Sequence, residues 1–259
     1  MYSQQRQLEI IQQIEKRGSV PVSELAERFT VSRETIRKDL SHLERQGILK
    51  RTHGGAVMEE PFTAHNSEYP VGIRGIQQMK EKKEICRKAA SFILEGDVIF
   101  VDNSSTPLYL PQFMPRQLNI TIITNSIKFL LETTKISDHN WLLLCLGGIF
   151  RAANLSVYGT GTIKSGAEYY PNKAFFSCAG ISPHSMVTDG SLQEIETKQM
   201  MITHAQETFL LADHTKLERT GQMRLCDFTD VDTLITDLNS SVAVPDYLSH
   251  IGIRLVMAD

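Results

Sequence analysis

Four polar segments of the chain combine the residue types that bind a phosphate with those that bind sugar hydroxyls. Hydroxyl side chains and free backbone N–H groups at a helix start favour a phosphate, particularly with a lysine nearby. Carboxylates and amides, here Asp102, Asn125 and Asp213, suit hydroxyl groups. The segments are Asp102-Asn103-Ser104-Ser105-Thr106, Thr124-Asn125-Ser126, Gly147-Gly148 and Asp213-His214-Thr215-Lys216. Any one alone is more typical of an ordinary helix cap, so the prediction depends on their lying together.

The surrounding elements predict that the four segments share one edge of a sheet. Each segment follows a short apolar run, and such runs alternate with helical segments. The predicted strands are 98–101, 120–124, 141–146, 173–179, 208–212, 234–236 and 253–256, and the helices include 85–92, 126–133, 195–205 and 245–250. This alternation predicts an α/β domain with a mostly parallel sheet covered on both faces. In such sheets ligands bind at the carboxyl ends of the strands.

A second group of candidate residues, near the N-terminus, is suited to DNA. A helix predicted from residue 33 to about residue 46 has Ile36, Leu40 and Leu43 on one face and a basic, polar face opposite. The early turns of such a helix meet base edges and phosphates in the major groove, and a following basic hairpin touches the DNA backbone. The candidate DNA contacts are Ser32, Arg33, Thr35, Arg37, Lys38, Ser41, Lys50, Arg51 and His53.

The flanking elements complete a winged helix-turn-helix. Ser23 is the predicted N-cap of a first helix, Thr30-Val31 the turn, Ser32 the N-cap of the second helix and Gly47 its end. The other predicted elements are helix 23–29, strand 48–52, turn 53–55 and strand 56–58, with the helix-turn-helix at about 20–39. The alternative is a helical pair inside an ordinary core with a solvated charged face. The capping residues and the basic hairpin favour DNA binding.

Charge is distributed unevenly along the chain. Residues 1–57 contain ten Lys and Arg against seven Asp and Glu, a net of +3, and the remainder contains 17 against 23, a net of −6. An N-terminal region with a net charge of +3 binds DNA only weakly by itself, because DNA affinity grows with the number of phosphates neutralised. Two or more such regions that bind DNA together would bind it more tightly, so we expect a homo-oligomer.

Composition indicates a cytoplasmic protein without a metal or another cofactor. The N-terminal residues 1–17 are polar and unlike a signal peptide, and the most apolar run, 141–150, is too short to cross a bilayer. The cysteines are far apart, and neither they nor the histidines have metal-ligand spacing. The predicted domains are a DNA-binding domain over 1–58, a linker over 59–75 and an α/β sensor domain over 76–259.

The chain resembles the DeoR family of bacterial sugar-metabolism repressors. Residues 20–57, VPVSELAERFTVSRETIRKDLSHLERQGILKRTHGGAV, match the family's N-terminal signature almost position by position. Later motifs match in order and spacing. They are Asp102–Thr106 for D-x-G-[ST]-T, Thr124-Asn125 for TN, Gly147-Gly148 for GG, Asp213–Lys216 for D-x-[ST]-K and Leu234–Asp237 for LITD.

The resemblance implies a sensor domain similar to ribose-5-phosphate isomerase, which binds a phosphorylated sugar and controls affinity for double-stranded operator DNA. It also implies a dimer or tetramer. The predicted effector contacts are Asp102, Asn103, Ser104, Ser105, Thr106, Thr124, Asn125, Gly147, Gly148 and Lys216. We predict a repressor of a carbohydrate operon that is released by such an effector.

Two residues depart from the family pattern. Ser104 stands where the family usually has glycine, which narrows the backbone freedom of the loop. Glu218 stands where glycine commonly occurs, and its carboxylate near Lys216 would weaken binding of an anion. These changes bear on which effector binds more than on whether one binds.

Other readings of the same residues remain open from sequence alone. Asp102, Asp189, Glu194 and Lys216 are residue types of an isomerase active site, so an enzyme fused to a DNA-binding head is the alternative. No carboxylate pair is fixed by local spacing, which favours the sensor. Glu196 and Lys198 could reach the site from a helix start or could form a solvated face. The Tyr158–Gly161 segment is predicted to be a turn with close packing.

Overall fold

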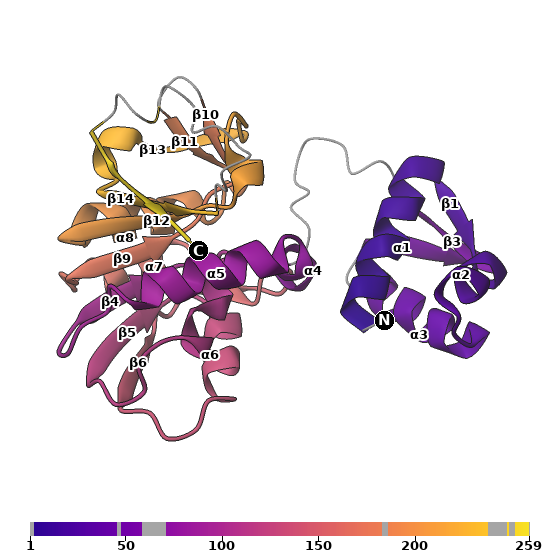
Figure 1. Cartoon of the computed structure of the whole chain (residues 1–259), viewed down its shortest axis with the longest axis horizontal. Helices are drawn as coiled ribbons and strands as arrows, with labels where there is room; N and C mark the ends of the chain where they lie inside the picture. The colour runs from indigo at the N-terminus through magenta and orange to yellow at the C-terminus, as the bar shows by residue number, and fades with distance from the viewer. Residues whose placement is uncertain are drawn as a thin grey trace. The chain divides into compact units, whose positions relative to one another are not determined.

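The computed structural model divides the chain into two compact units, Met1–Gln77 (unit 1) and Gln78–Asp259 (unit 2), both drawn in Figure 1. It describes residues 3–45, 48–58, 71–182, 186–237, 248 and 252–258. The predicted helix end at Gly47, most of the predicted linker and most of the predicted helix 245–250 lie outside these residues.

Unit 1 is a winged helix-turn-helix, as predicted. Its elements are α1 (Ser3–Arg17), β1 (Ser19–Pro21), α2 (Val22–Phe29), α3 (Arg33–Arg45), β2 (Leu49–Thr52), β3 (Gly55–Met58) and α4 (Val71–Ile76). The three strands form an antiparallel sheet in the order β1-β3-β2. The first three helices bury their apolar faces in one core, to which α1 contributes Ile10 and Ile14, α2 contributes Leu25, and α3 contributes Ile36 and Leu40.

The start of α2 differs from the prediction. Ser23 is not its N-cap, because the helix begins one residue earlier, at Val22, after Pro21 in the cap position. Val22 is buried in the core of unit 1, and this packing extends the helix beyond the residue with the better capping side chain. Strand β1 was not predicted, since three residues are too short for a periodic pattern. Its pairing with β3 requires glycine at 55, where a Cβ would lie 2.4 Å from the Val20 carbonyl oxygen.

Part of the predicted linker is helical. Residues 71–76 form α4 within unit 1, and Val71 and Gly75 on this helix are buried. This segment was not predicted to be a helix because two of its six residues are glycine, which has a low helix propensity. Burial of one face of the segment offsets that low propensity.

Unit 2 is an α/β domain around a parallel sheet, as predicted. Its sheet strands are β4 (Val98–Val101), β5 (Ile120–Thr124), β6 (Trp141–Cys145), β9 (Lys173–Phe176), β12 (Glu207–Leu211), β14 (Thr233–Thr236) and β15 (Arg254–Met257). They lie in the order β15-β14-β12-β9-β4-β5-β6, and every pairing is parallel. The remaining elements are α5 (Met79–Ala90), η1 (Pro107–Gln112), α6 (Ile127–Thr133), β7 (Ile149–Arg151), β8 (Ser156–Tyr158), α7 (Thr160–Gly166), β10 (Gly180–Ser182), β11 (Met186–Asp189), α8 (Ile195–His204), η2 (His214–Lys216), β13 (Met223–Asp227) and η3 (Phe228–Asp230).

Helices cover both faces of this sheet. Helix α5 crosses the face nearest the viewer in Figure 1 and contacts β12 and β14. Helices α7 and α8 contact each other, and α8 packs on the opposite face, where Met200 and Met201 share a core with Phe100, Ile123 and Ala174. The β7–β8 hairpin and the antiparallel sheet β10-β11-β13 were not predicted. Their strands are three to five residues long and pair across turns or longer loops.

Candidate functional site

Helix α3 presents a basic face to solvent. Its buried face contains Ile36, Leu40 and Leu43, whereas Arg33, Arg37 and Lys38 are exposed. The predicted cap is confirmed, because Ser32 Oγ accepts a hydrogen bond of 3.1 Å from the backbone N–H of Thr35 and lies 2.9 Å from Thr35 Oγ1. The guanidinium of Arg37 lies 3.6 Å from Glu34, and both side chains are exposed, so this ion pair is weak and exchangeable. The face can therefore offer its cations to phosphates or base edges.

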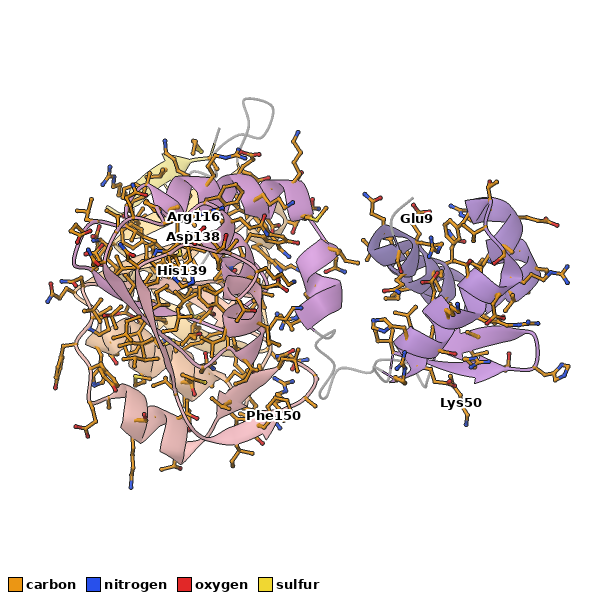
Figure 2. All side chains as sticks on the ribbon, turned by 90° about the horizontal axis from the view of Figure 1, so that it is seen from below. Glu9, Lys50, Arg116, Asp138, His139 and Phe150 are labelled. Atoms are coloured by element: carbon orange, nitrogen blue, oxygen red, sulfur yellow. The ribbon has the colours of Figure 1, made fainter. Side chains whose placement is uncertain are left out.

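The two predicted wing cations have different surroundings. Lys50 is exposed and extends from β2 away from the helices of unit 1 (Figure 2). Arg51 instead turns back to α3, where its guanidinium donates a 2.6 Å hydrogen bond to Ser41 Oγ and its backbone N–H donates one of 2.9 Å to Glu44. His53 is exposed at the turn. Arg51 thus anchors the wing to α3, and Lys50 is the more accessible cation.

A buried ion pair ties α3 to α1. The carboxylate of Asp39 is 4% exposed and accepts hydrogen bonds from Ser3 Oγ, Gln7 Nε2 and Arg6 Nε, of which the first two are 3.0 and 3.1 Å long. Sequence reasoning missed this pair. The available signal was the position of Asp39, which lies three residues after Ile36 and is in phase with the apolar face.

In unit 2 the polar residues that follow β4 and β5 come together. Because β4 pairs with both β5 and β9, their carboxyl ends are neighbours. The buried predicted residues in this cluster are Asp102, Asn103, Ser104, Ser105, Thr106, Thr124 and Asn125, each at most 7% exposed. We call them, together with the charged side chains that reach them, the polar site. Ser104 is not among the positive-φ residues, so glycine is not required there.

The polar site is built around a lysine of α8. Lys198 is 4% exposed, and its Nζ donates hydrogen bonds to Ser104 Oγ at 2.8 Å, to the Ser177 carbonyl oxygen at 3.2 Å and to Asp189 Oδ2. It also lies 3.2 Å from Asp102 Oδ2. Of the two readings left open by the sequence, the structure therefore excludes a solvated face for this side chain.

Asp102 is fully engaged by donors. Its Oδ1 accepts from the Ser104 backbone N–H at 3.1 Å, and its Oδ2 accepts from Ser104 Oγ at 2.6 Å and lies beside Lys198. Burial raises the pKa of Asp102 above its ordinary value, although Lys198 and the bonds from Ser104 act against this shift. We regard the group as ionised, because the ammonium of Lys198 and the backbone N–H groups of Ser104 and Ser177 all face its oxygens, and none of these donors can accept a proton from it. Its carboxylate shapes the loop, and the same geometry leaves it little capacity for a sugar hydroxyl.

A second buried lysine reaches the same loop from α5. Lys82 is 3% exposed, and its Nζ donates a 3.1 Å hydrogen bond to Ser105 Oγ. On the same helix the thiol of Cys86 donates to the carbonyl oxygen of Thr106 at 3.1 Å. Thr106 Oγ1 lies 3.4 Å from Ser177 Oγ. A cation and hydroxyl groups are thus adjacent at the Ser105–Thr106 end of the loop.

Glu194 forms another charged centre next to the site. Its carboxylate accepts hydrogen bonds from Asn154 Nδ2 at 3.0 and 3.1 Å and from Ser156 Oγ at 2.8 Å, and it lies 3.1 Å from the guanidinium of Arg151. Burial alone would raise the pKa of Glu194, but the nearby amides of Asn103 and Asn154 and the charge of Arg151 lower it. Glu194 is therefore ionised, and the positive charge of Arg151 compensates its negative charge.

Two buried amide atoms of the site have no hydrogen-bond partner among the described residues, Asn103 Nδ2 and Asn125 Oδ1. The amide orientations are defined, because Asn125 Nδ2 donates to Asn103 Oδ1 at 3.3 Å and to the Val157 carbonyl oxygen at 3.1 Å. Asn103 still lies close enough to Glu194 to influence its pKa. Unpaired buried polar atoms are uncommon and indicate a place for a ligand or water.

The two remaining predicted segments lie further along the edge. Gly147 and Gly148 are exposed, and a Cβ on Gly148 would lie 2.0 Å from Thr162 Oγ1, so this glycine permits close packing. The side chain of Lys216 is partly buried and makes no hydrogen bond or ion pair within the described part of the chain. It lies close enough to Cys178 to act against the burial that raises the pKa of that thiol. Asp213 Oδ2 is also buried without a partner there. The assignment of Gly147, Gly148 and Lys216 to the effector stays a prediction.

Sequence reasoning missed Lys82 and gave Lys198 no definite place. The available signal for both lysines was their position on the helix, in phase with buried residues. Lys82 shares its phase with Ile85, Cys86 and Ala89, which are buried on α5, and Lys198 shares its phase with buried residues of α8. A lysine on an apolar helix face is a signal for a buried partner, because an unpaired buried charge is costly.

The residues that the structure describes contain neither a helix long and apolar enough to cross a membrane nor a His, Cys, Asp and Glu cluster arranged for a metal ion.

Known proteins match both units. The family model described as DeoR-like helix-turn-helix domain matches residues 6–62, and the one described as DeoR C terminal sensor domain matches residues 77–238. An uncharacterized HTH-type transcriptional regulator of Bacillus subtilis, YulB, is 35% identical over 90% of this chain and 88% of its own. The glycerol-3-phosphate regulon repressor of Escherichia coli is 28% identical over 98% of this chain and 99% of its own.

Among solved structures, ribose 5-phosphate isomerase A of Methanocaldococcus jannaschii is similar to this chain with a TM-score of 0.38 and 17% identity, over 52% of this chain and 53% of the other.

Proposed function

The chain belongs to the DeoR family of transcriptional regulators, and we propose that it represses a carbohydrate operon and leaves its operator when a phosphorylated sugar binds to unit 2. The observation that carries the proposal is the joining of a winged helix-turn-helix to a buried site where Lys82 and Lys198 meet a hydroxyl-rich loop. The glycerol-3-phosphate regulon named for one relative supports a phosphorylated polyhydroxy compound as the effector.

On the DNA side, the exposed Arg33, Arg37 and Lys38 of α3 would enter the major groove, and Lys50 of the wing would contact the phosphate backbone. Ser32, Thr35 and Ser41 would help to position the helix or donate to phosphates. His53 at the wing turn remains a candidate contact. The operator is double-stranded, and two or more copies would bind it together, because one small basic head is a weak anchor.

On the effector side, the phosphate would lie against Ser105 and Thr106 near Lys82, with Lys216 as a further charge partner. Buried hydroxyls and a cation suit a phosphate in a site from which water is largely excluded. The rest of the ligand would reach Asn103 and Asn125, whose unpaired atoms suit hydroxyl groups. Asp102, Ser104 and Thr124 would support this arrangement through the loop backbone.

The isomerase alternative is weaker on geometry. The carboxylates that the sequence offered as a base are Asp102, Asp189 and Glu194, and each already accepts hydrogen bonds from charged or polar donors. A general base must be able to take a proton from a substrate within hydrogen-bond reach. Carboxylates held in this way stabilise a fixed site and are poor proton acceptors.

Operator release is the direct test. Operator fragments would first be selected from random duplexes, and a gel shift would then follow release by glucose 6-phosphate, fructose 6-phosphate, ribose 5-phosphate and glycerol 3-phosphate. Lys82→Ala and Lys216→Ala should bind the operator normally and need at least tenfold more effector for release, because each loses a charge-assisted contact of about 1.5–3 kcal/mol. Normal release curves for both variants, or substrate turnover by the wild type, would contradict the proposal. A regulator acting on operator DNA in this way works in the cytoplasm.

A further inference from the structure

We infer that the polar site accepts only ligands with a single anionic group, a monophosphate whose remainder is uncharged and carries hydroxyls, and that Ser104 enforces this selection. The inference rests on the proposed function, because it names the class of phosphorylated compound that would bind.

Lys198 has no hydrogen-bonding capacity left for a ligand. An ammonium group has three N–H donors. Four oxygens lie within its reach, on Ser104, Ser177, Asp189 and Asp102. No N–H of this lysine is left for a ligand. Although it is the most central cation of the site, it cannot serve as a second anion-binding group unless one of these contacts is broken.

The part of the polar site around Lys198 and Glu194, which we call its deep end, carries a net negative charge. Lys198 is one cation between two carboxylates, Asp102 and Asp189, so this trio carries a net charge of −1. The next pair, Arg151 and Glu194, is neutral. A second phosphate or a carboxylate would therefore meet a net negative field in a buried region, where charges are poorly screened. Neutral hydroxyls meet no such penalty.

Two buried amide atoms at the deep end are available to a ligand. Asn103 Nδ2 is a buried donor that lies near the Glu194 carboxylate but forms no hydrogen bond of normal geometry among the described residues. Asn125 Oδ1 is a buried acceptor that also has no partner there. A hydroxyl group can accept from the first and donate to the second, whereas a phosphate or carboxylate can only accept. The unpaired atoms thus match the same class of ligand as the charges do.

Ser104 links these observations, and it departs from the family's glycine at this position. Its hydroxyl donates to Asp102 Oδ2 at 2.6 Å and accepts from Lys198 at 2.8 Å. Glycine could make neither bond. Removing the hydroxyl would free one N–H of Lys198 and weaken its attachment to Asp102, which would make the cation available to a second anion.

Matched pairs of compounds test the selectivity by thermal shift and by isothermal titration on the full-length protein. The pairs are glycerol 3-phosphate with 3-phosphoglycerate, glucose 6-phosphate with 6-phosphogluconate, and fructose 6-phosphate with fructose 1,6-bisphosphate, with inorganic phosphate as the minimal probe. The singly anionic member should bind at least tenfold more tightly in every pair that binds. Equal or tighter binding of the partner with the second anion would overturn the inference while leaving the proposed phosphate site intact. Absence of a shift with all seven compounds would refute the proposed function itself, and the inference with it.

Neighbouring serines of the loop supply matched variants. Ser104→Gly should reduce the tenfold preference to about threefold or less, and Ser104→Ala should do the same without adding backbone freedom. Ser105→Ala removes the hydroxyl that Lys82 contacts, so it should weaken both members of each pair by a similar factor and leave their ratio unchanged. An unchanged ratio in folded Ser104→Gly and Ser104→Ala would remove Ser104 from the selective role.

Discussion

The cations proposed to bind DNA in unit 1 and those of the polar site in unit 2 differ most in their exposure. Arg33, Arg37 and Lys38 lie on the solvent face of α3, whereas Lys82 and Lys198 are buried among hydroxyls and carboxylates. An exposed cation contributes little to folding and interacts with DNA largely independently of its neighbours. A buried one is tied to several partners, so its removal affects folding and ligand response together.

This difference also determines how mutants must be interpreted. A DNA-binding defect in an exposed α3 variant reports on the contact itself, because the core of unit 1 is untouched. A loss of effector response in a polar-site variant has two causes to separate, and thermal stability must be measured beside it. The buried pair of Arg6 and Asp39 is the exception in unit 1, since it behaves like the charges of unit 2.

The largest expected effect is on the stability of unit 2. Lys198→Ala leaves Asp102 and Asp189 buried without their shared cation, and breaking such a buried pair costs about 3–5 kcal/mol of the free energy of unfolding. The measurement is urea denaturation at neutral pH. Lys164→Ala is the matched control, because it removes an exposed lysine of the same unit and should change stability by less than about 0.5 kcal/mol. Similar small losses in both variants would end the contrast between buried and exposed cations.

The next effect is on operator affinity. Arg37→Ala and Lys38→Ala should each weaken binding by about 1–3 kcal/mol if they contact bases or well-fixed phosphates. Their thermal unfolding should match the wild type, because both side chains lie off the buried face of α3. Arg17→Ala removes the same charge from α1 and serves as the control. A gel-shift titration at fixed salt in which all three variants bind alike would exclude α3 as the recognition helix.

Sequence predicted the elements whose pattern is local and missed those that depend on distant partners. The strands from β4 to β15 in the main sheet could be recognised from apolar runs, and α3 from its period and its Ser32 cap. By contrast, β1 and the sheet β10-β11-β13 are short and are stabilised by pairing with residues far along the chain.

The same distinction holds for the candidate site. The loop from Asp102 to Thr106 was predicted because its hydroxyls are contiguous, whereas Lys82 and Lys198 come from two helices and meet it only after folding. The separation between Lys198 and Ser104 is 94 residues. Sequence spacing cannot encode such a contact, although the helical phase of both lysines already marks them as buried.

The wing gives a smaller effect that sharpens the comparison within unit 1. Lys50→Ala should lower affinity for operator and random DNA alike and make the salt slope shallower by about 0.9, the value for one phosphate contact. Arg51→Ala additionally removes the hydrogen bond to Ser41, so it should also reduce the discrimination between operator and random DNA. Affinities would be measured from 50 to 200 mM salt. Loss of discrimination in Lys50→Ala with an unchanged slope would indicate that Lys50 contacts bases.

The smallest expected effect is a pH dependence in unit 2, at the loop that carries Lys216. A hydrogen bond from His214 Nδ1 to Asp237, 2.6 Å long, raises the pKa of this histidine, and burial acts in the opposite direction. Because the folded pKa lies above the unfolded value near 6.5, the stabilisation is complete below about pH 6 and is lost as pH rises through the raised pKa.

Asp237→Asn tests this charge interaction while its amide oxygen can keep the bond from the His214 backbone N–H. The side chain of His214 is 37% exposed, so solvent screening limits the loss to about 1 kcal/mol or less. Melting temperatures of wild type and variant should therefore differ most at pH 5.5–6 and converge towards pH 8.5, measured in buffers of equal ionic strength. A difference that stays constant over this range would mean that the charge of His214 does not contribute to the stabilisation by Asp237. In that case the exposed histidine would contribute as little to folding as the exposed cations of α3, and the contrast would depend on the buried lysines only.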